Sequence, residues 1–599
     1  MAKKFYITTP IYYPNDIPHI GHAYTTIAAD VIARWKKQKG NDVFFLTGTD
    51  DHGKKIAEAA REAGKSPKDF TDELIPKFKD AWNRLDIEYD RFIRTTDKDH
   101  EQLVKEILQK VYDKGDIYKG KYEGLYCIYC EAYYTEKELE EGNCPIHKKL
   151  VEKLKEETYF FRLSKYKKEL LKLYDQHPKF ISPKHRKQEI INRVKEGLKD
   201  LSISRTSFDW GIPLPFDKKH ICYVWFDALF NYYSATRKKG FEKFWPCDLH
   251  VIGKDILWFH TVYWPAFLMS AGLKLPKVIY AHGWWTFDKE KISKSRGKVI
   301  NVDELISIAG VDSVRYFLLR EASFGEDGDF SIESLVERHN NELANKLGNL
   351  VSRVSSLAEE YGIKKTKGSL IKQLNKKKIE KYFDSYELDK ALSEIFRFID
   401  ICNEYTQKKK PWETGDKKVL FELVEALRKI AKLLYPFIPK TSEKISKIFK
   451  LDKIKKADIL FSKIGQPINR KQNLNKEEEP KEIMEGVASA GEINFGDFEK
   501  LDLRVGEVQS IEEIKGADLL YKLTVSLGEE ARTICAGIKE YYSHDDLRGK
   551  KVIVLANLKP RKLKGIMSHG MLLAAGSKEE HVCSLLTPDS DVKVGMKIS

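Results

Sequence analysis

Pro10-Ile-Tyr-Tyr-Pro-Asn-Asp-Ile-Pro-His-Ile-Gly-His22 lies close to the N-terminus, between an apolar segment and a helical pattern. Phe5-Tyr-Ile-Thr-Thr9, just before it, has the aromatic and β-branched content of a short buried strand. After it, apolar residues recur every four positions from Ile27 to Trp35, which predicts a helix that Gly40 ends. The apolar run 42–47 then supplies a second strand. The order of strand, helix and strand predicts a parallel sheet with a ligand crevice at its strand ends.

Two histidines, His19 and His22, lie one turn apart at the expected start of that helix. Helix N-termini favour anions, so two imidazoles there suit a polyphosphate. Alone, the short motif H-x-G-H is equally compatible with two surface histidines in a Pro-rich turn. A second basic motif, Lys291-Ile-Ser-Lys-Ser295, favours the first interpretation, because lysines on flexible stems can follow phosphates as pyrophosphate leaves. The alternative for this second motif is a solvated loop.

Length and charge limit the class of protein. With 599 residues the chain is too long for one core, so about three to five domains are expected. The net charge of +15 and the pI of about 9.0 favour a polyanionic partner such as nucleic acid, although lysine-rich surfaces also keep proteins soluble. The sequence has no apolar run of membrane-spanning length and no signal-peptide core near its start. We therefore expect a cytoplasmic protein.

Three of the eight cysteines cluster near a histidine. Cys127, Cys130, Cys144 and His147 form the pattern C-x2-C-x13-C-x2-H. Tetrahedral zinc takes thiolate and imidazole ligands at such spacing. Because all four ligands would come from the protein, the pattern predicts a structural zinc site with no place for a catalytic water. The alternative is three free cysteines, which a reducing compartment has little need to cluster.

Polar and aromatic residues follow the later strands of the predicted sheet. Gly48-Thr-Asp-Asp-His-Gly53 comes after the second strand, where Asp50 or Asp51 could hold a substrate ammonium or cap a turn or helix. The segments 223–233 and 250–260 each run from a strand into a helix. Their aromatic residues could line a pocket, although an aromatic stripe is more commonly core.

The C-terminal half changes character twice. Apolar seams at helical spacing between Leu343 and Leu434 predict an all-α bundle. Residues 465–491 lack apolar periodicity and predict a linker. Alternating apolar residues such as those of 523–527, with turns at glycines such as Gly506, then predict a small barrel of the OB type, which binds nucleic acid. The basic loop expected at 559–564 fits that role, or is a solvated turn.

HIGH at 19–22 and KISKS at 291–295, in this order, resemble the signature motifs of class I aminoacyl-tRNA synthetases. An insert with zinc-ligand spacing, too short for an editing domain, narrows the resemblance to the methionyl-tRNA synthetase family. The resemblance implies an α/β fold, with a Rossmann-like parallel-sheet catalytic domain, a zinc-binding insert, an all-α anticodon-binding bundle and a C-terminal β-barrel (OB fold). The expected parts are a first catalytic half (1–115), the insert (116–215), a second catalytic half (216–283) and a KISKS and stem-contact segment (284–335). The bundle (336–462), a linker (463–491) and the barrel (492–599) follow.

The resemblance also implies an activity. The chain is expected to activate L-methionine with ATP and Mg²⁺ to methionyl-adenylate, and to transfer the methionyl group to the 3′-terminal adenosine of tRNA(Met). No side-chain nucleophile is needed, so positioning and charge neutralisation carry the reaction. One structural Zn²⁺ per subunit and a homodimer through the C-terminal domain are also expected. Two rival interpretations are a synthetase for another apolar amino acid and a non-catalytic tRNA-binding protein derived from a synthetase.

Site residues follow from the same resemblance. The residues expected in catalysis are His19, His22, Lys291, Lys294 and Arg205. Those expected to bind ATP are His19, Gly21, His22, Gly253, Asp255, Lys291, Ser293 and Lys294. The expected methionine pocket consists of Ile11, Tyr13, Asp50, Trp225, Ala228, Leu229, Tyr232, Ile256, Phe259 and His260. Anticodon contacts are expected at Asn349, Arg353 and Trp412, and further tRNA contacts at Lys559, Arg561, Lys562 and Lys564.

Within the pocket, the resemblance places Tyr232 and His260 near the thioether sulfur and Asp50 at the α-ammonium. The sequence departs from the family pattern at two places. Leu229 stands where some relatives have proline, which affects the wall of the pocket. In the barrel, Ala517-Asp-Leu-Leu520 replaces Ala-Asp-Lys-Leu, so one basic contact is absent there.

Overall fold

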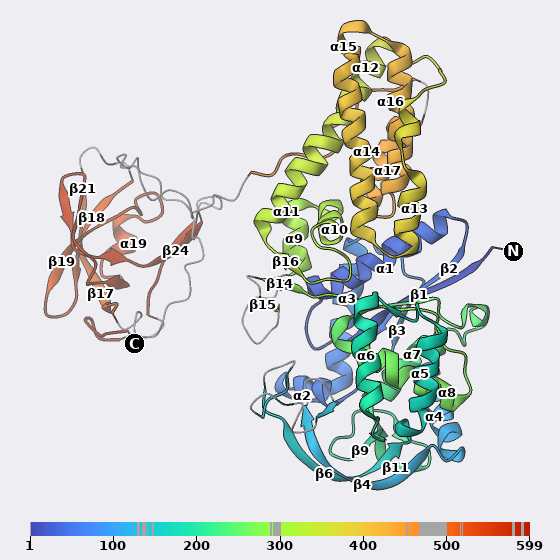
Figure 1. Ribbon diagram of the computed structural model, residues 1–599. Helices are drawn as coiled ribbons and strands as arrows, with labels where there is room; N and C mark the ends of the chain where they lie inside the picture. Colours follow the sequence, from blue (N-terminus) through green and yellow to red (C-terminus); the bar gives the residue numbers. More distant parts are fainter. Residues whose placement is uncertain are drawn as a thin grey trace. The chain divides into compact units, whose positions relative to one another are not determined.

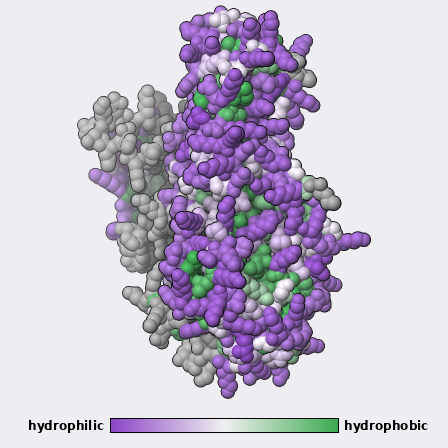
Figure 2. Space-filling model, turned by 45° about the vertical axis from the view of Figure 1, so that its right-hand side comes forward, coloured by the Kyte–Doolittle hydropathy of each residue, from purple (hydrophilic) through white to green (hydrophobic). Residues whose placement is uncertain are grey.

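The structure is a computed structural model, and its described residues are 2–127, 132–134, 139, 142–145, 149–287, 290–291, 301–450, 453–465, 500–514, 517, 519–577, 582–588 and 592–598. They fall into two compact units, Met1–Arg470 and Lys471–Ser599 (Figure 1). The face seen in Figure 2 is mainly hydrophilic, and its hydrophobic residues form small separate groups. None of the described helices combines the length and apolar composition that a membrane crossing requires.

A six-stranded parallel sheet organises the first unit, as predicted. Its order is β3-β2-β1-β12-β13-β7. The strands are β1 (Lys4–Tyr12), β2 (Asp42–Thr49), β3 (Arg91–Arg94), β7 (Ile181–Ser182), β12 (Leu249–Gly253) and β13 (Ile279–His282). Because β1 has β2 on one side and β12 on the other, the strand order reverses at β1, and such a switch point opens a crevice at the strand ends. The edge strand β7 comes from the segment predicted as the insert.

Helices cover both faces of this sheet, because alternate strand residues point to opposite faces. Phe5 and Ile7 join the apolar cluster that contains residues of α1 (Ile20–Gln38) and α3 (Pro67–Arg84). Tyr6 and Phe44 join the opposite cluster. Helices of that second cluster are α4 (Lys98–Asp113), α5 (Lys167–Gln176), α6 (Lys184–Glu196), α7 (Val224–Ser234) and α8 (Trp264–Ala271). The short helix α2 (Lys54–Glu62) follows β2.

Helix α1 connects the sheet to the helical bundle. It follows β1 directly, and Gly40 just beyond it has a φ of 79°, as expected for the glycine that ends a helix. In its C-terminal half the Trp35 ring stacks on Phe383 of the bundle, with 4.0 Å between centroids. At its centre, buried Asp30 pairs with the buried guanidinium of Arg315 at 2.6 Å. The same helix therefore carries His22 at one end and bundle contacts at the other (Figure 1).

The insert and the segment after β13 form small sheets. In the insert the strand order is β5-β4-β6-β8. A second small sheet, β10-β11-β9, includes β11 just beyond the insert, and β15-β14-β16 is the order after β13. These strands are β4 (Ile117–Cys127), β5 (Ala132–Tyr134), β6 (Glu152–Phe161), β8 (Leu201–Ser202), β9 (Ser204–Arg205), β10 (Pro213–Leu214), β11 (Asp217–Cys222), β14 (Trp285–Phe287), β15 (Glu290–Lys291) and β16 (Gly328–Phe330).

The bundle is helical throughout, as its seams predict. Its helices, with the two that precede it, are α9 (Val302–Ala309), α10 (Val311–Arg320), α11 (Ile332–Arg338), a π-helical stretch His339–Gly348, α12 (Asn349–Tyr361), α13 (Lys376–Asp384), α14 (Leu388–Lys409), α15 (Pro411–Thr414), α16 (Lys417–Leu434) and α17 (Pro439–Ile448). Ordered contacts continue beyond α17, because Asn340 Nδ2 donates to the Ile464 carbonyl at 2.8 Å and the Ile464 amide donates back at 3.0 Å.

The second unit is a nearly closed antiparallel barrel of the expected kind. Its main sheet runs β19-β18-β17-β20-β23, with hairpins β21-β22 and β24-β25 beside it. The elements are β17 (Leu503–Glu513), β18 (Tyr521–Ser526), β19 (Ala531–Ala536), α19 (His544–Leu547), β20 (Lys551–Leu555), β21 (Arg561–Leu563), β22 (Ile566–Ser568), β23 (Met571–Leu572), β24 (Ala574–Ser577) and β25 (Val582–Leu585). Leu523 and Val525 of β18 are buried, so the predicted alternation is confirmed.

The sequence predicts a turn at Gly506, but this residue lies inside β17. A Cβ atom at this position would come within 2.7 Å of the Val525 side chain and 2.9 Å of the Val554 side chain. The glycine therefore lets two neighbouring strands place large side chains over it.

Candidate functional site

The two histidines of HIGH lie together at the N-terminus of α1. His19 caps the helix, and its Nδ1 accepts a hydrogen bond from the Gly21 amide at 3.1 Å. His22 Nδ1 lies 3.4 Å from the His19 amide, and the two rings stack with 3.8 Å between centroids. The first turn of α1 has no acidic residue. This end of the helix is thus suited to an anion, as the sequence predicts.

Gly21 is required by this ring arrangement. A Cβ atom at position 21 would come within 3.0 Å of His19 Cε1 and 3.2 Å of His19 Nδ1. A larger residue would therefore push the His19 ring away from the helix end.

The two aspartates after β2 have different surroundings. Asp51 is buried, and its Oδ2 accepts hydrogen bonds from Arg94 Nε at 2.6 Å and Thr96 Oγ1 at 2.8 Å. Asp50 is also buried, and its Oδ1 accepts a hydrogen bond from Thr95 Oγ1 at 3.5 Å. A substrate ammonium at Asp51 would have to compete with the Arg94 guanidinium. The assignment of the ammonium to Asp50 stays a prediction.

The aromatic residues of the two later segments meet. Trp225 of α7 stacks on Phe259 with 3.8 Å between centroids and an interplanar angle of 1°. Tyr232 Oη, one and a half to two turns further along α7, lies 2.7 Å from His260 Nε2. Phe259 and His260 begin a π-helical segment, Phe259–Tyr263, a conformation that is frequent at functional sites. Most of the other expected pocket residues join the same apolar cluster, namely Ile11, Tyr13, Leu229 and Ile256. Ala228 is buried on α7 beside them.

Hydrogen bonds define the proton positions of the Tyr232–His260 pair. The Ile256 carbonyl, 3.0 Å from His260 Nδ1, can only accept, so Nδ1 carries the proton. His260 Nε2 must then accept from the Tyr232 hydroxyl. Burial lowers the pKa of His260 to about 4 and raises the pKa of Tyr232 well above its usual value. The pair is therefore neutral and polar within an apolar wall.

Two residues expected near ATP, Gly253 and Asp255, lie at the end of β12. A Cβ atom on Gly253 would come within 2.5 Å of Asp255 Oδ1, which accepts a hydrogen bond from Trp284 Nε1 at 3.1 Å. His282 at the end of β13 contacts Thr25 of α1, with 2.7 Å between Nε2 and Oγ1. Position 291 lies in β15. The expected contacts Ser293 and Lys294 fall outside the described residues.

Arg205 ends β9, and its side chain lies against the residue that precedes α7. Its guanidinium is buried over the ring of Tyr223, the residue that precedes α7, at 4.7 Å from the ring centroid. Its Nη1 donates to Ser202 Oγ at 2.9 Å and to the Ser204 carbonyl at 2.6 Å. These contacts tie the insert to the pocket helix, and a role for Arg205 toward ATP stays a prediction.

Only part of the predicted zinc site can be described. Cys127 ends β4, Cys144 lies in the segment 142–145, and both are buried, reduced thiols. Cys130 and His147 lie outside the described residues. Within the described ranges, no group of three or more His, Cys, Asp or Glu side chains is arranged so that it could hold a metal ion. The zinc site stays a prediction from spacing.

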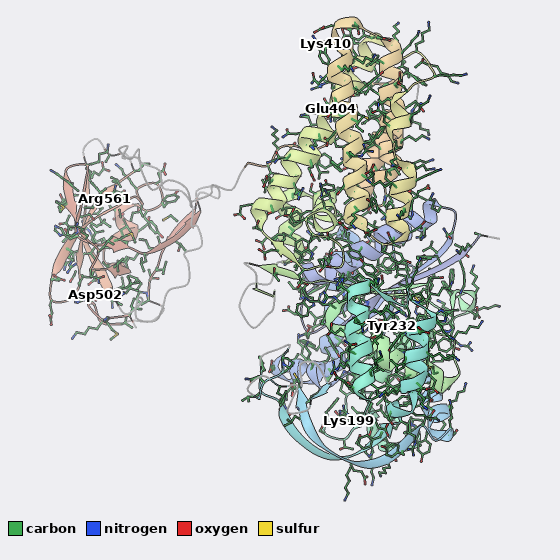
Figure 3. The ribbon with its side chains drawn as sticks, viewed as in Figure 1. Lys199, Tyr232, Glu404, Lys410, Asp502 and Arg561 are labelled. Carbon is green, nitrogen blue, oxygen red and sulfur yellow. The ribbon has the colours of Figure 1, made fainter. Side chains whose placement is uncertain are left out.

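Two expected anticodon residues meet at the end of the bundle. The Arg353 guanidinium of α12 lies 5.9 Å from the centre of the Trp412 ring of α15. Asn349 is exposed one turn before Arg353. Trp412 keeps 37% of its surface exposed. Figure 3 marks Lys410, just before α15, at the end of the bundle that is away from the sheet.

The basic segment of the barrel is a hairpin rather than a loop. Strand β21 pairs with β22 in antiparallel register, and the two residues between them, Lys564 and Gly565, have φ values of 45° and 87°. Positive φ at both positions is the pattern of a two-residue hairpin turn. The side chains expected to contact tRNA are all exposed, namely Lys559, Arg561, Lys562 and Lys564 (Figure 3 labels Arg561).

Three family models match the chain. The model "tRNA synthetases class I (M)" matches residues 5–153 and 137–355. The model "Anticodon-binding domain of tRNA ligase" matches residues 369–517, and a tRNA binding domain model matches residues 503–597. Together these models follow the expected order of catalytic domain, bundle and barrel.

Relatives align with the whole chain. The "Methionine--tRNA ligase" of Caldanaerobacter subterraneus subsp. tengcongensis is 46% identical over 641 residues, with 100% of both chains covered. That of Thermotoga maritima is 44% identical over 630 residues, again with 100% of both chains covered. The chain belongs to the methionine–tRNA ligase family. A solved structure of this family, Mycobacterium tuberculosis methionyl-tRNA synthetase in complex with methionyl-adenylate, aligns with a TM-score of 0.72 and 41% identity, covering 74% of this chain and 94% of that one.

One buried polar group of this family member was missed by sequence reasoning. Asp227 of α7 lies between His52 and His100, with 2.7 Å from each carboxylate oxygen to the nearer imidazole nitrogen. The three residues belong to segments far apart in the chain. The one available signal is residue type. His52 lies two residues after Asp50 and Asp227 directly precedes Ala228, and such polar side chains beside a buried pocket are costly to bury unless they are paired.

Proposed function

We propose that this chain is a methionine–tRNA ligase, which joins L-methionine to the 3′-terminal adenosine of tRNA(Met) with ATP. Two groups of residues carry the proposal. The stacked pair His19–His22 caps α1 directly after β1, and the Trp225–Phe259 stack adjoins the hydrogen-bonded pair Tyr232 and His260. Full-length relatives named methionine–tRNA ligase support the proposal.

The first step forms methionyl-adenylate. The carboxylate of methionine attacks the α-phosphate of ATP, a P–O bond forms, and pyrophosphate leaves with the electron pair of the broken bond. His19 and His22 at the positive end of α1 stabilise the phosphates, together with Lys291 and Lys294 of the second motif. Asp50 takes the α-ammonium, and Mg²⁺ accompanies ATP. Further ATP contacts come from Gly21, Gly253, Asp255 and Ser293, and Arg205 acts beside them.

The second step transfers the amino acid. A hydroxyl of the terminal adenosine attacks the carbonyl carbon of the adenylate, and AMP leaves. No protein nucleophile takes part in either step, so the contribution of the protein is to position the reactants and neutralise charge.

Selection of methionine rests on the aromatic pocket. Its walls are Ile11, Tyr13, Trp225, Ala228, Leu229, Ile256 and Phe259. The thioether is less polar than a hydroxyl and a weak acceptor, so it suits an apolar wall with one neutral donor, the Tyr232 hydroxyl beside His260. Leucine and isoleucine can fill part of the volume but offer no acceptor.

A structural zinc ion is part of the proposal. Cys127, Cys130, Cys144 and His147 form a donor set of three thiols and one imidazole, which is a zinc-binding combination. The burial of Cys127 and Cys144 supports this fit. The ion would hold the insert together and would supply no chemistry to the reaction.

The bundle and the barrel would bind tRNA. Asn349, Arg353 and Trp412 contact the anticodon, with Trp412 stacking on a splayed base. The exposed cations Lys559, Arg561, Lys562 and Lys564 add phosphate contacts, and the barrel joins two chains in a homodimer. We retain the domain boundaries expected from the sequence, which assign catalysis, anticodon binding and further tRNA binding to separate parts of the chain.

ATP–pyrophosphate exchange across a panel of amino acids tests the function. Methionine should support exchange far better than leucine, isoleucine or valine. Preference for another apolar amino acid would favour a different synthetase, and exchange with none would favour a non-catalytic tRNA-binding protein. A chain ended after Gly465, which keeps the Asn340–Ile464 contact, should retain exchange but bind tRNA more weakly at low salt and sediment as a monomer.

A further inference from the structure

Asp227 is clamped between two histidines inside the catalytic domain. Its Oδ2 lies 2.7 Å from His52 Nδ1 and its Oδ1 lies 2.7 Å from His100 Nε2. The exposed fractions of Asp227, His52 and His100 are 1%, 4% and 0%. The outer nitrogen of His100, Nδ1, lies 2.8 Å from Ser234 Oγ. Both carboxylate oxygens therefore have a partner, as a buried charge requires.

These residues join three separate elements. His52 follows β2 and lies two residues after Asp50, and His100 is in the first turn of α4. Asp227 and Ser234 are both on α7, so the network grips the pocket helix at two places two turns apart. Two proposed methionine contacts are neighbours of this network in the sequence. Ala228 follows Asp227 directly, and Asp50 shares a short loop with His52.

The charges of the network are complementary. A carboxylate can only accept, so both imidazole nitrogens that face Asp227 carry protons. Burial by itself lowers the pKa of His52, but the Asp227 carboxylate offsets this and raises it above the usual value. Burial raises the pKa of Asp227, but the two histidines lower it further than burial raises it. Asp51 and Glu101 also raise the pKa of His52.

We propose that Asp227, held by His52 and His100, is a positioning residue for the amino-acid site. It sets the distance between the Asp50 loop, which would hold the α-ammonium, and helix α7, which would enclose the side chain. The network does not touch the substrate, and it acts by fixing the two elements that do. This inference rests on the proposed function, because it assigns a structural basis to methionine recognition in the same site.

The test is Asp227→Asn in the full-length chain, measured by ATP–pyrophosphate exchange. An amide is nearly isosteric, but it donates where the carboxylate accepted, so one histidine loses its acceptor. We expect the KM for methionine to rise about tenfold or more, because small misplacements of binding groups have effects of this size. The KM for ATP should change little, and discrimination between methionine and its shorter and longer homologues should weaken.

A matched control is Asp116→Asn. Asp116 is likewise a buried carboxylate, bound by Lys165 Nζ at 2.6 Å and Ser270 Oγ at 2.7 Å, but it is not among the proposed substrate contacts. This variant should lower the melting temperature while the KM for methionine stays near that of the unmodified chain.

A milder variant, Ser234→Ala, removes only the outer hydroxyl of the network and keeps the inference testable if Asp227→Asn does not fold. It should raise the KM for methionine by a smaller factor, and Ser234→Thr, which restores a hydroxyl, should recover part of the loss. The inference is overturned if the two KM values rise equally, if Asp116→Asn has the same effect, or if Ser234→Ala has none. A wild-type chain that shows no exchange with methionine would instead reject the proposed function, and the inference with it.

Discussion

Tyr232 Oη donates a hydrogen bond to His260 Nε2 over 2.7 Å, and His260 Nδ1 donates to the Ile256 carbonyl. The imidazole thus has no second proton to offer, and the one hydroxyl hydrogen of Tyr232 can reach a substrate sulfur only by leaving His260 Nε2. Sequence resemblance assigns both residues to the sulfur, but the hydrogen bonds give them unequal roles. We therefore expect Tyr232 to be the donor to a bound sulfur, and His260 to accept the hydroxyl hydrogen when the sulfur is absent.

Tyr232→Phe should therefore raise the KM for methionine by about fivefold, the value of one modest hydrogen bond. The KM for norleucine, which has a methylene group in place of sulfur, should change much less. Tyr233→Phe is a matched control, because its half-buried ring is next in sequence and packs on Trp245. Equal losses for methionine and norleucine would mean that Tyr232 acts only through packing.

His260 should make the fold acid-sensitive. Its pKa is about 4 in the fold and near 6.5 when unfolded, so below pH 6.5 the unfolded chain gains a proton that the folded chain does not. Its contribution, on the order of 3 kcal/mol, is present above pH 6.5 and is lost as the pH falls toward 4. Buried His250 and His282 act in the same direction, whereas the raised pKa of His52 acts in the opposite one.

Urea unfolding at pH 7.5 and pH 5 measures this effect. The unmodified chain should lose more free energy of unfolding between the two pH values than His260→Gln does. Identical losses would show that His260 does not titrate differently in the folded and unfolded chains.

Gly21→Ala should separate stability from activity. Alanine favours the helix by up to about 1 kcal/mol, so thermal stability should be kept or raised. The added Cβ would lie 3.0 Å from His19 Cε1 and displace that ring, so pyrophosphate exchange should fall about tenfold or more. Normal exchange in a stable Gly21→Ala variant would show that the His19 ring position is unimportant for the first step.

Cys144→Ala should release zinc. Structural zinc sites in peptides contribute on the order of 10 kcal/mol, so the insert should also become sensitive to proteolysis. Cys402→Ala is the control, because this buried thiol of α14, whose pKa burial raises to about 12, has no reason to bind zinc. Elemental analysis of the pure proteins decides the matter, and absence of zinc from the unmodified chain would reject the site.

Trp412→Ala should weaken aminoacylation of tRNA by about 1–3 kcal/mol, the usual value of one base stack. Pyrophosphate exchange without tRNA should be unaffected. Tyr112→Ala is matched in exposure, since both aromatic residues keep 37% of their surface exposed, and it should leave the KM for tRNA unchanged. A parallel loss of exchange in Trp412→Ala would make Trp412 a structural residue.

The sequence predicts the features that depend on neighbours along the chain. The period from Ile27 to Trp35 locates α1, and alternation at Leu523 and Val525 locates β18, because helices and strands bury residues at fixed intervals. The signature motif at His19 also lies where its pattern places it, at a helix N-terminus.

Features that depend on distant residues were not predictable in this way. The two-residue strand β7 has no periodicity and exists because it pairs with β13. The choice between Asp50 and Asp51 depends on Arg94, which the fold brings from β3. The segment with Lys564 was expected as a basic loop, and its hairpin depends on pairing with β22. The expected turn at Gly506 was wrong because glycine there serves strand packing.

The position of α1 affects how this chain can be engineered. The stack of Trp35 on Phe383 and the hydrogen bond from Arg34 Nη1 to Tyr435 Oη at 3.3 Å join the second half of this helix to the bundle. A chimaera that exchanged the bundle at the boundary suggested by the sequence would leave these side chains facing foreign partners at the far end of the helix that holds His22. A workable graft must therefore carry the matching face of α1 with the bundle, so recombination of the two modules requires a cut inside a helix rather than in a loop.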